Sequence, residues 1–565
     1  MPDTKLLFAA LTTLLLGACT STSAPKTPAT LAVEVPQVAH PQDETPQWWY
    51  RNGAAQAAAN GAMNGKAKNV ILFLGDGMSL TTVAAARILE GQRQGNPGEE
   101  NLLSWEHFPA TAFSKTYNTD SQTPDSAGTM TAITTGVKTH MGAIGVSAGI
   151  RNDCADSLDK HLLTWLQLAD SAGLATGMVS TARLTHATPA ATYANSPDRN
   201  WENDTDLPQA ARAAGCVDIA QQLLTTARFG HGPRVVLGGG RAQFMPVEER
   251  DPEYDDKVGL RLDGRNLVTE WQQAHPQGAY VWNAAQLQAA AAAPALLGLF
   301  EPDHMQYEHD RGNDRGGEPS LAELTRAAIA NLSTHPEGYV LMVEGARIDH
   351  ANHSGNAARA LGDTIALSDA VRAASEATSA DDTLIIVTAD HSHTLNFVGY
   401  PARGNPILGK VKDKGGEDGT GGLELARDAI GLPYTTLSYA NGPGYTGASN
   451  QQPAGPKKFP HAPSSFDPAN GRPDLSHVDT EHPDYMQEAL VPSKSESHGG
   501  EDVGIWARGP GSNAVRGTLE QNAIYHLIVQ ATPRLRQRLC AADTCNAQGV
   551  PVELPQPVKF ERKQP

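Results

Sequence analysis

The sequence predicts an α/β protein with a mostly parallel central sheet and helices on both of its faces. Short apolar runs of strand length recur along the chain, helix-like segments lie between several of them, and polar residues follow the runs. Continuous apolar strands that alternate with helices are typical of parallel sheets buried on both sides. The predicted strands are residues 69–77, 174–182, 234–240, 339–346 and 383–393.

The N-terminus has the pattern of an export signal. Lys5 precedes an apolar run at residues 6–16, which is too short to span a bilayer and has the length of a signal-peptide core. The run ends in LGAC, which resembles a bacterial lipobox and implies cleavage before Cys19 and lipid attachment to its thiol. The alternative is an ordinary signal peptide with an incidental cysteine. Residues 1–19 are thus predicted to be a signal peptide with a lipobox, and residues 20–45 a flexible tether.

The remaining chain, residues 46–565, is predicted to form one domain with a large insertion. An Ala-rich stretch at its start predicts a helix, and residues 161–173 and 320–333 have the apolar spacing of helices. From about residue 400 to 495, Gly, Pro, Asn and Lys dominate, which favours a crown-like insertion or lid over a second core. Residues 497–510 return to strand-like sequence and belong to the main domain.

The charge of the chain excludes one class of partner. Its 565 residues include 62 Asp and Glu but only 44 Lys and Arg, which gives a formal net charge of −18. Nucleic acid demands a basic surface, so it is not expected as a specific partner. The acidity either keeps the protein soluble or commits some of the carboxylates to bound cations.

Export would place the cysteines in an oxidising compartment, where disulfides form. Four cysteines besides Cys19 allow three pairings. Because Cys540 and Cys545 close a short loop, the favoured pairs are Cys540–Cys545 and Cys154–Cys216. A zinc site built from these residues is less favoured, since the chain has no CxxC motif.

Acidic and histidine side chains come at the ends of the predicted strands. Asp76 lies at the end of the first, Glu344 near the end of the fourth, and Asp390 and His391 near the end of the fifth. Ligands bind beyond the carboxyl ends of strands in open α/β sheets, so these groups should meet at one edge. Carboxylates and imidazoles without thiolates suit zinc together with a harder ion such as magnesium. Further candidate ligands nearby in the sequence are Asp349, His350, His353, His393 and His498.

The stretch TPDSAGTM, residues 123–130, places a serine at a predicted helix start. Asp125 or Ser126 would be the N-cap, and small residues follow. Taken alone, the pattern indicates only a helix start, although the N-terminal end of a helix also favours an anion.

Four motifs together resemble the alkaline phosphatase family, and most closely its animal-type branch: PDSAGT, VEGARIDHANH, TADHSH and SHGGEDV. The stretches THATPAATYANSPDRNW and GLFEP match as well, and the resemblance runs from about Pro46 to the C-terminal cysteine pair. It implies an alkaline phosphatase-like fold and a catalytic domain, residues 46–565, that hydrolyses phosphate monoesters with bound metals.

The resemblance also implies roles for single residues. Ser126 would be the nucleophile and form a phosphoseryl intermediate; a free serine needs activation, which a metal provides in this family. The planar guanidinium of Arg199 would hold two phosphate oxygens. Two zinc ions would clamp the attacking and leaving oxygens. The implied ligands are Asp349, His353 and His498 for one zinc, Asp76, Asp390 and His391 for the other, and Asp76, Thr188 and Glu344 for magnesium.

Two histidines near these ligands follow the animal-type pattern. His186 stands where some bacterial relatives carry Asp, and His350 stands in place of a bacterial Lys, which changes the charge around the third metal and the phosphate. Magnesium occupancy and the pH optimum of the bacterial prototype are therefore not expected to transfer, and His186 is kept as a metal-site candidate. Asp125 and His393 are either in contact with a metal or phosphate or only structural.

The animal-type resemblance implies one further ion, a peripheral calcium. Its ligands would be Glu253, the Phe300 carbonyl, Glu301 and Glu318, where Glu318 stands in place of the family's usual Asp. Calcium tolerates such irregular geometry. The alternative is a set of solvated surface acids.

Two other functions were weighed against an exported phosphomonoesterase. A related metal-dependent phosphodiesterase or sulfatase is disfavoured by the serine nucleophile and by Arg199, and an inactive surface binding lipoprotein by the complete ligand set. The resemblance also implies a homodimer, with the helix at residues 46–60 embracing the partner and the insertion at the interface. The expected location is the periplasm or cell surface, with a membrane anchor at Cys19.

Overall fold

The structure is a computed structural model that describes residues 44–413 and 424–562. The predicted signal peptide, Cys19 and nearly all of the tether lie outside the described residues. Within the described part of the chain, no helix has the length and apolar character needed to cross a membrane.

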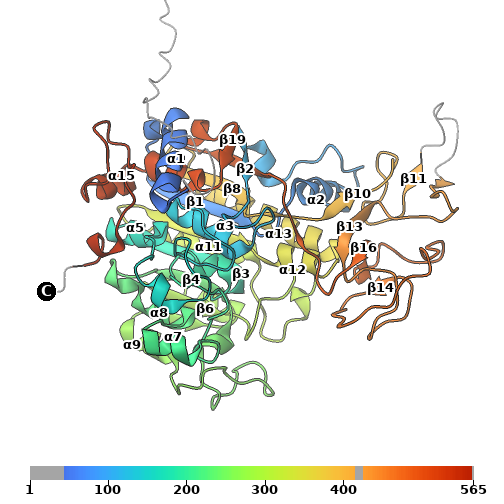
Figure 1. The fold of residues 1–565 in the computed structure, drawn as a ribbon, viewed down its shortest axis with the longest axis horizontal. Coiled ribbons are helices and arrows are strands. Elements are labelled where there is room, and N and C mark those ends of the chain that lie inside the picture. The colour runs from blue at the N-terminus through green and yellow to red at the C-terminus, as the bar shows by residue number, and fades with distance from the viewer. Residues whose placement is uncertain (1–43, 414–423, 563–565) are drawn as a thin grey trace, which may run out of the picture.

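Ten strands form one central sheet with the order β19-β2-β18-β8-β1-β7-β3-β4-β6-β5 (Figure 1). Every neighbouring pair is parallel except the two that β18 makes with β2 and β8. The prediction of a mostly parallel sheet is confirmed. The strands are β1 (Asn69–Gly75), β2 (Ala110–Lys115), β3 (Ala175–Arg183), β4 (Val235–Gly239), β5 (Ala279–Val281), β6 (Leu296–Leu299), β7 (Tyr339–Gly345), β8 (Thr383–Ala389), β18 (Val503–Arg508) and β19 (Thr518–Glu520).

Alternate side chains of the central strands enter two separate cores. Val70, Leu72 and Leu74 of β1 pack on one face, and Ile71 and Phe73 on the other. This explains why the run is apolar without a break: both faces exclude water. The first face is covered by α1 (Pro46–Ala59), α3 (Ser126–Thr135), α5 (Trp165–Ser171), α6 (Ala187–Ala190), α8 (Ile219–Thr225), α9 (Leu267–Ala274), α14 (Ala523–Ala531) and α15 (Pro533–Cys540). The second is covered by α2 (Leu80–Arg93), α10 (Ala284–Ala289), α11 (Leu321–Leu332), α12 (Arg347–His353) and α13 (Ala357–Ala377).

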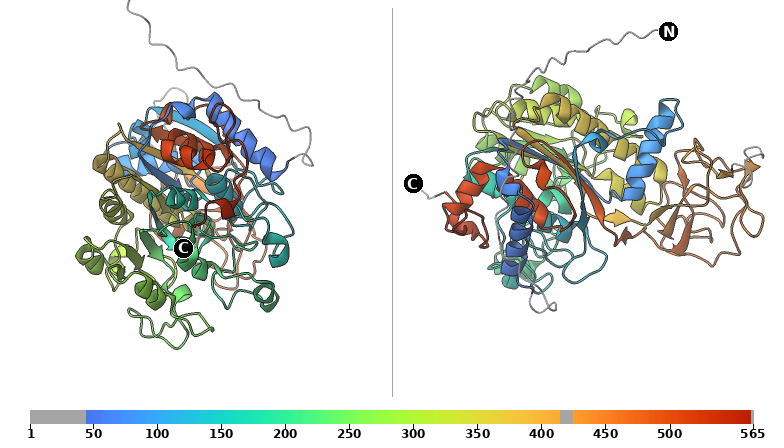
Figure 2. Two further views of the ribbon diagram at one scale, coloured as in Figure 1. Left: turned by 90° about the vertical axis from the view of Figure 1, so that its left-hand side faces the viewer. Right: turned by 90° about the horizontal axis from the view of Figure 1, so that it is seen from above.

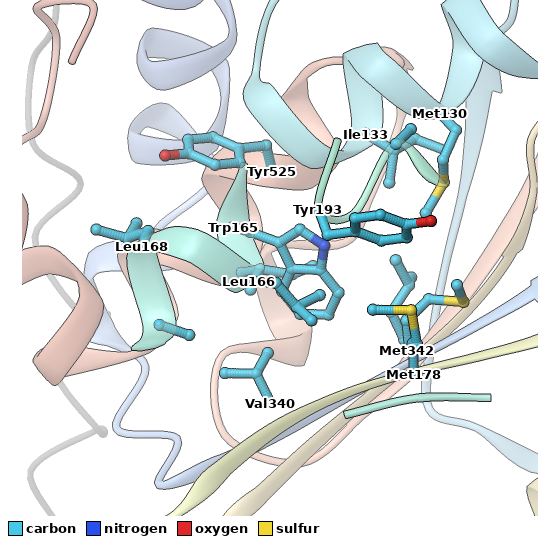
Figure 3. Close-up of a cluster of buried hydrophobic side chains, with 14 of the residues drawn as sticks. Met130, Ile133, Trp165, Leu166, Leu168, Met178, Tyr193, Val340, Met342 and Tyr525 are labelled. Carbon is cyan, nitrogen blue, oxygen red and sulfur yellow. The ribbon is translucent and has the colours of Figure 1, made fainter. Parts of the chain in front are cut away.

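Large side chains fill the space between α3 and the first face of the sheet (Figure 3). Trp165 and Tyr193 lie between Met130 of α3 and the strand residues Met178 and Met342. All five side chains are at least 97% buried. The helix that carries Ser126 therefore rests on a closely packed layer.

Several sequence predictions of local structure are confirmed with shifted ends. The helix expected at the start of the domain is α1, and Thr164 caps α5 later than the predicted start at residue 161. The fifth predicted strand ends early, at Ala389. A short strand β9 (Ser392–His393) follows and pairs antiparallel with β17 (His498–Gly499).

The segment between β9 and β17 contributes small sheets at one end of the molecule (Figures 1 and 2). In Figure 1 this segment lies at the right, far from the C-terminal helix α15. One sheet comprises β10 (Leu395–Phe397), β13 (Leu437–Gly442) and β16 (Ala489–Pro492). Two further pairs are β11 (Lys412–Asp413) with β12 (Glu424–Leu425), and β14 (Lys457–Lys458) with β15 (Tyr485–Met486).

Both favoured disulfides are formed. Cys154–Cys216 joins α4 (Cys154–Ser157) to the residue just after α7 (Gln209–Ala214) and its cap, and Cys540–Cys545 closes the turn after α15. Their Cα–Cα distances of 5.9 and 4.8 Å lie within the normal range for disulfides.

Candidate active site and metal centre

The register of the three middle strands brings acids to one edge of the sheet. Gly75 of β1 pairs with Gly345 of β7 on one side and with Ala389 of β8 on the other. Asp76, Glu344 and Asp390 therefore lie at neighbouring strand ends, and all three are fully buried. This is the convergence that the sequence predicts.

Helix α12 follows β7 directly and adds two more ligand candidates. Asp349 and His353 are four residues apart, so they lie on the same side of the helix. Asp349 Oδ2 is 3.4 Å from His353 Nε2. The short pairing of β17 with β9 then brings His498 from the far end of the chain, with its Nε2 3.1 Å from His353 Nε2 and 3.3 Å from Asp349 Oδ1.

Two groups of possible ligand atoms result, each with its atoms within 4.8 Å of one another. The first contains Asp349, His353, His393 and His498, and the second Asp76, Asp349 and His391. Asp390 belongs beside the second group, because its Oδ2 is 3.3 Å from His391 Nε2, which also lies 3.4 Å from Asp76 Oδ1. Asp349 thus belongs to both groups.

A third set of oxygens lies behind Asp76. Thr188 of α6 donates a long hydrogen bond from its hydroxyl to Asp76 Oδ2, at 3.5 Å. Glu344 accepts a hydrogen bond from the Ser180 hydroxyl. Asp76 Oδ1 and Glu344 Oε1 are buried and have no hydrogen-bond partner among the described residues, so each has an oxygen free to bind a cation.

The clustered buried carboxylates of the site favour the binding of cations. Burial raises the pKa of Asp76 well above its usual range, and the neighbouring Asp390 and Asp349 carboxylates raise it further. Burial raises the pKa of Glu344 to about 8. Burial, followed by the proximity of His498, lowers the pKa of His391 well below its ordinary value, which leaves a neutral imidazole that can bind a metal. Divalent cations would offset the clustered negative charge, so the residues present fit the predicted metals.

Ser126 begins α3 next to the second group. Asp125 is the N-cap, and its Oδ1 accepts a hydrogen bond from the Gly128 amide at 3.1 Å. The Ser126 hydroxyl lies 3.1 Å from His391 Nε2, and the residue is 2% exposed. The sequence leaves the choice of cap open between Asp125 and Ser126; because Asp125 caps the helix, the serine hydroxyl is free to face the metal ligands.

Arg199 is held at the same place by two partners. Its Nη1 donates to Asp125 Oδ2 and its Nη2 to His186 Nε2, both at 3.1 Å. Burial lowers the pKa of His186 well below its ordinary value, and Arg199 lowers it further, so the ring is a neutral acceptor. The rings of His304 and His350 lie 5.3 and 5.4 Å from that of His186. His304 was not a sequence candidate.

His393 and Glu496 complete the first group from outside. His393 Nε2 is 2.7 Å from Asp349 Oδ1, and its Nδ1 is 2.5 Å from Glu496 Oε2. Burial opposes a charge on the ring, but the two flanking carboxylates raise its pKa to about 10. Glu496 was not a sequence candidate either. It lies two residues before His498, and this spacing does not mark it as functional.

The predicted calcium ligands are only partly brought together. Glu253 and Glu301 form a group with Asp314, whose ligand atoms lie within 4.8 Å of one another. Glu318 is outside that group, and its Oε2 accepts a hydrogen bond from the Gln306 amide. Glu318 stays a predicted ligand: burial, with contributions from the nearby Glu301 and Asp314, raises its pKa to about 9. Asp314 is a further candidate that the sequence does not single out. Both acids lie in the irregular stretch between β6 and α11, where no periodic pattern fixes which side chain turns inward.

Comparison with known proteins agrees with this geometry. The alkaline phosphatase family model matches residues 67–533. The chain is 41% identical to the tissue-nonspecific alkaline phosphatase isozyme of Gallus gallus over 505 residues, which cover 87% of this chain and 90% of that protein. It is also 41% identical to the human tissue-nonspecific isozyme over 474 residues, which cover 82% and 83% of the two chains.

Solved structures share the fold at lower identity. The alkaline phosphatase of Thermus thermophilus superposes with a TM-score of 0.56 at 23% identity and covers 85% of this chain and 96% of its own. That of the Antarctic bacterium TAB5 superposes with a TM-score of 0.53 at 20% identity, over 83% and 99% of the two chains. With a family model that matches most of its length and relatives that are 41% identical, the chain belongs to the alkaline phosphatase family and is a metal-dependent phosphatase.

Proposed function

We propose that this enzyme is an exported alkaline phosphatase that hydrolyses phosphate monoesters through a phosphoseryl intermediate on Ser126. The observation that carries the proposal is the position of the Ser126 hydroxyl, 3.1 Å from His391 Nε2 at the edge of the buried carboxylate and imidazole groups. A hydroxyl at a helix N-terminus, beside ligands for two cations, is suited to attack an anionic ester.

Each group of side chains would hold one of the predicted ions. Asp349, His353 and His498 would bind one zinc ion, Asp76, Asp390 and His391 the second, and Asp76, Thr188 and Glu344 magnesium. When bound, the ions supply positive charge that lowers the pKa of the serine hydroxyl and stabilises the departing alkoxide. A His-to-Asp variant of the TAB5 phosphatase has magnesium bound in its M3 site, which supports a third metal position in this fold.

The chain's own residues supply the nucleophile and position the phosphate. The Ser126 hydroxyl loses its proton to solvent, the Oγ–P bond forms as the bond from phosphorus to the ester oxygen breaks, and the departing alkoxide takes up a proton from solvent to leave as the alcohol. Water then cleaves the Oγ–P bond, which releases inorganic phosphate and restores the hydroxyl. Arg199, oriented by Asp125 and His186, would hold two non-bridging phosphate oxygens with its planar guanidinium.

A further calcium ion would be bound by Glu253, the Phe300 carbonyl, Glu301 and Glu318, and Asp314 lies close enough to Glu253 and Glu301 to contribute another oxygen. Burial raises the pKa of Glu301 to about 8, and the nearby Glu253 and Asp314 contribute to the increase. A hard divalent cation would relieve the repulsion among these carboxylates.

Export, anchoring and assembly are proposed on other grounds. The apolar run at residues 6–16 and the LGAC motif support a signal peptide and a lipid anchor at Cys19, facing the periplasm or cell surface. The two disulfides support an oxidising compartment. Family membership supports a homodimer in which α1 and the insertion at residues 400–495 meet the partner.

The test combines metal analysis with a substrate panel. Purified protein loaded with zinc and magnesium is expected to contain two zinc ions per chain and to hydrolyse p-nitrophenyl phosphate at least 100-fold faster than bis-p-nitrophenyl phosphate or p-nitrophenyl sulfate. A preference for the diester or the sulfate would instead support the related diesterase or sulfatase. Failure to turn over any of the three by zinc-loaded protein would support a binding lipoprotein.

A further inference from the structure

We propose that Glu496 is a positioning residue that fixes the group of Asp349, His353 and His498, and that it acts on Asp349 through His393. This inference rests on the proposed function, in which that group holds one of two zinc ions. The Glu496 carboxylate hydrogen-bonds to His393 and Thr394, and its Oε2 lies 3.9 Å from Nδ1 of the predicted ligand His353, which is too far for a hydrogen bond. Its effect on the metal group must therefore pass through the residues that it holds.

The carboxylate of Glu496 is fully buried and fixed by three donors. Its Oε2 lies 2.5 Å from His393 Nδ1, and its Oε1 accepts hydrogen bonds from the Thr394 amide at 2.7 Å and the Thr394 hydroxyl at 2.6 Å. The side chain has no exposed surface. A buried carboxylate with both oxygens engaged has one orientation, and it imposes that orientation on the His393 ring.

His393 transmits this constraint to Asp349. Its other nitrogen, Nε2, is 2.7 Å from Asp349 Oδ1. Both ring nitrogens are thus taken up by carboxylates, and no nitrogen remains to bind a metal. Asp349 is left with Oδ2 on the side of His353 Nε2, at 3.4 Å. This resolves the question of His393 in favour of an orienting role, because outer hydrogen bonds of this kind fix the ligating atom.

The backbone of Glu496 orients a second member of the group. Its carbonyl oxygen lies 2.5 Å from His353 Nδ1, and its amide donates to the His353 carbonyl at 2.9 Å. A proton on Nδ1 that is donated to a carbonyl leaves Nε2 as the ligating nitrogen. One residue therefore fixes both Asp349 and His353.

The proposed second zinc site of Asp76, Asp390 and His391 has two ligands that are held by groups other than Glu496. His391 Nδ1 lies 3.2 Å from the Ser392 carbonyl, and Asp390 is held by the Gly77 amide and the Thr129 hydroxyl. Loss of the Glu496 carboxylate should consequently weaken one ion and spare the other. This difference is the specific signature of the proposal.

The insertion holds Glu496 in place from behind. Gly442, at the end of β13, packs so closely that a Cβ there would lie 3.0 Å from Glu496 Cβ. The neighbouring Asn441 accepts a hydrogen bond from the Ser497 amide and donates one to the Ser497 hydroxyl, both at 2.9 Å. Strand β13 of the insertion is thus connected to the metal group through Glu496.

The experiment measures zinc affinity by competition with a chromophoric chelator in the full-length protein. Glu496→Gln keeps the shape of the side chain but removes its charge, and we expect it to weaken one of the two zinc ions by 10- to 100-fold while the other changes less than threefold. The matched control is Glu488→Gln: this half-buried carboxylate lies on the same returning segment and binds Arg472, without contact to the site. Its zinc affinities should equal those of the wild type.

Two further variants test the route. His393→Ala should still bind two zinc ions at saturation, with one of them weakened, and adding Glu496→Gln should weaken it less than twofold more. Loss of a zinc ion at saturation would make His393 a ligand and overturn the proposal, as would additive effects of the two changes. If the wild type binds two zinc ions and Glu496→Gln binds both with unchanged affinity, the role of Glu496 is refuted while the proposed function stands. A wild type that does not bind two ions contradicts the proposed function itself.

Discussion

Arg199 reaches the site because two side chains hold its guanidinium. Asp125 caps α3 with Oδ1 and binds Arg199 with Oδ2, so the same carboxylate aligns the helix that carries the serine and the proposed phosphate-binding group. A local sequence pattern that indicates only a helix start thereby sets the relative position of two functional groups.

The first prediction concerns the shape of the Arg199 side chain. A lysine provides one charge but no planar fork, so it cannot bind two phosphate oxygens in parallel. Arg199→Lys is expected to lower kcat/KM for p-nitrophenyl phosphate by about 10- to 100-fold, about 1.4–3 kcal/mol, mostly through a higher KM. Steady-state kinetics would measure this, with Arg212→Lys on exposed α7 as the control. Equal kinetics in the two variants would exclude Arg199 from phosphate binding.

At the scale of single residues the sequence predicts most of the candidate site, but it misses residues that orient the predicted ligands without binding a metal themselves. Ser126, Asp349 and His498 stand in motifs that are dense in polar residues. Glu496, by contrast, is a single acid whose role exists only because a long insertion returns beside His393. Asp314 was missed because the loop between β6 and α11 has no regular period.

The elements around the site differ in how far sequence predicts them. The central strands are buried on both faces and read as unbroken apolar runs, so they were found. The strand β2 alternates buried and exposed residues over only six positions, and β5 and β19 have three residues each. Such short or alternating strands at and near the sheet edges have no apolar run to mark them. The antiparallel direction of β18 depends on its partners in the sheet, which a single sequence does not specify.

The second prediction tests how tightly α3 is packed at its C-terminal end. Gly136 ends α3 with φ +77°, and a Cβ there would lie 2.8 Å from both His526 Nε2 and Tyr525 Cδ1. Gly173 follows α5 with the same φ of +77°, but a Cβ there would meet nothing within 4 Å. An alanine would therefore introduce the same backbone strain at both positions, and only at position 136 would its Cβ also collide with neighbouring side chains.

Gly173→Ala is expected to lower the free energy of unfolding by about 1–2 kcal/mol from left-handed strain alone. Gly136→Ala should lower it by a further 1–3 kcal/mol, approximately the cost of overpacking. Urea denaturation of the chelator-treated protein would give both values. If the two variants lost equal stability, the packing described between α3 and α14 would be wrong.

For the whole molecule, the sequence predicts the fold class and the edge of the sheet that carries the site. The strand order was not predicted, because β2 joins the sheet through β18 and β19 through β2, in pairs whose residues are about 400 positions apart. The stability of the assembled molecule also depends on buried histidines outside the site. His526 is part of α14 and faces α1, with its ring 4.5 Å from that of Tyr50.

The third prediction follows from that burial. Burial lowers the pKa of His526 to about 3, from an ordinary value near 6.5. Below pH 6.5 the unfolded chain binds a proton at this ring and the folded protein does not. The free energy of unfolding therefore decreases as the pH is lowered, until the pKa of the folded protein is reached. His526 should contribute about 1.4 kcal/mol per pH unit to that loss between about pH 5.5 and 4.

His526→Gln should reduce this slope by the same amount in chelator-treated protein, measured by urea denaturation at several pH values. His477→Gln, which changes an exposed histidine, serves as the control and should leave the slope unchanged. Identical slopes in wild type and His526→Gln would mean that the buried ring is charged in the folded protein.

The central claim is that buried carboxylates and imidazoles at the strand ends activate Ser126 as the nucleophile. The direct test is rapid acid quenching of zinc-loaded enzyme during turnover of p-nitrophenyl phosphate, followed by peptide mapping of the bound phosphate by mass spectrometry. The phosphate is expected on Ser126, and Ser126→Ala should lose both the label and at least 1,000-fold in kcat, while Ser171→Ala on α5 retains both. Phosphate on another residue, or full turnover by Ser126→Ala, would contradict the account.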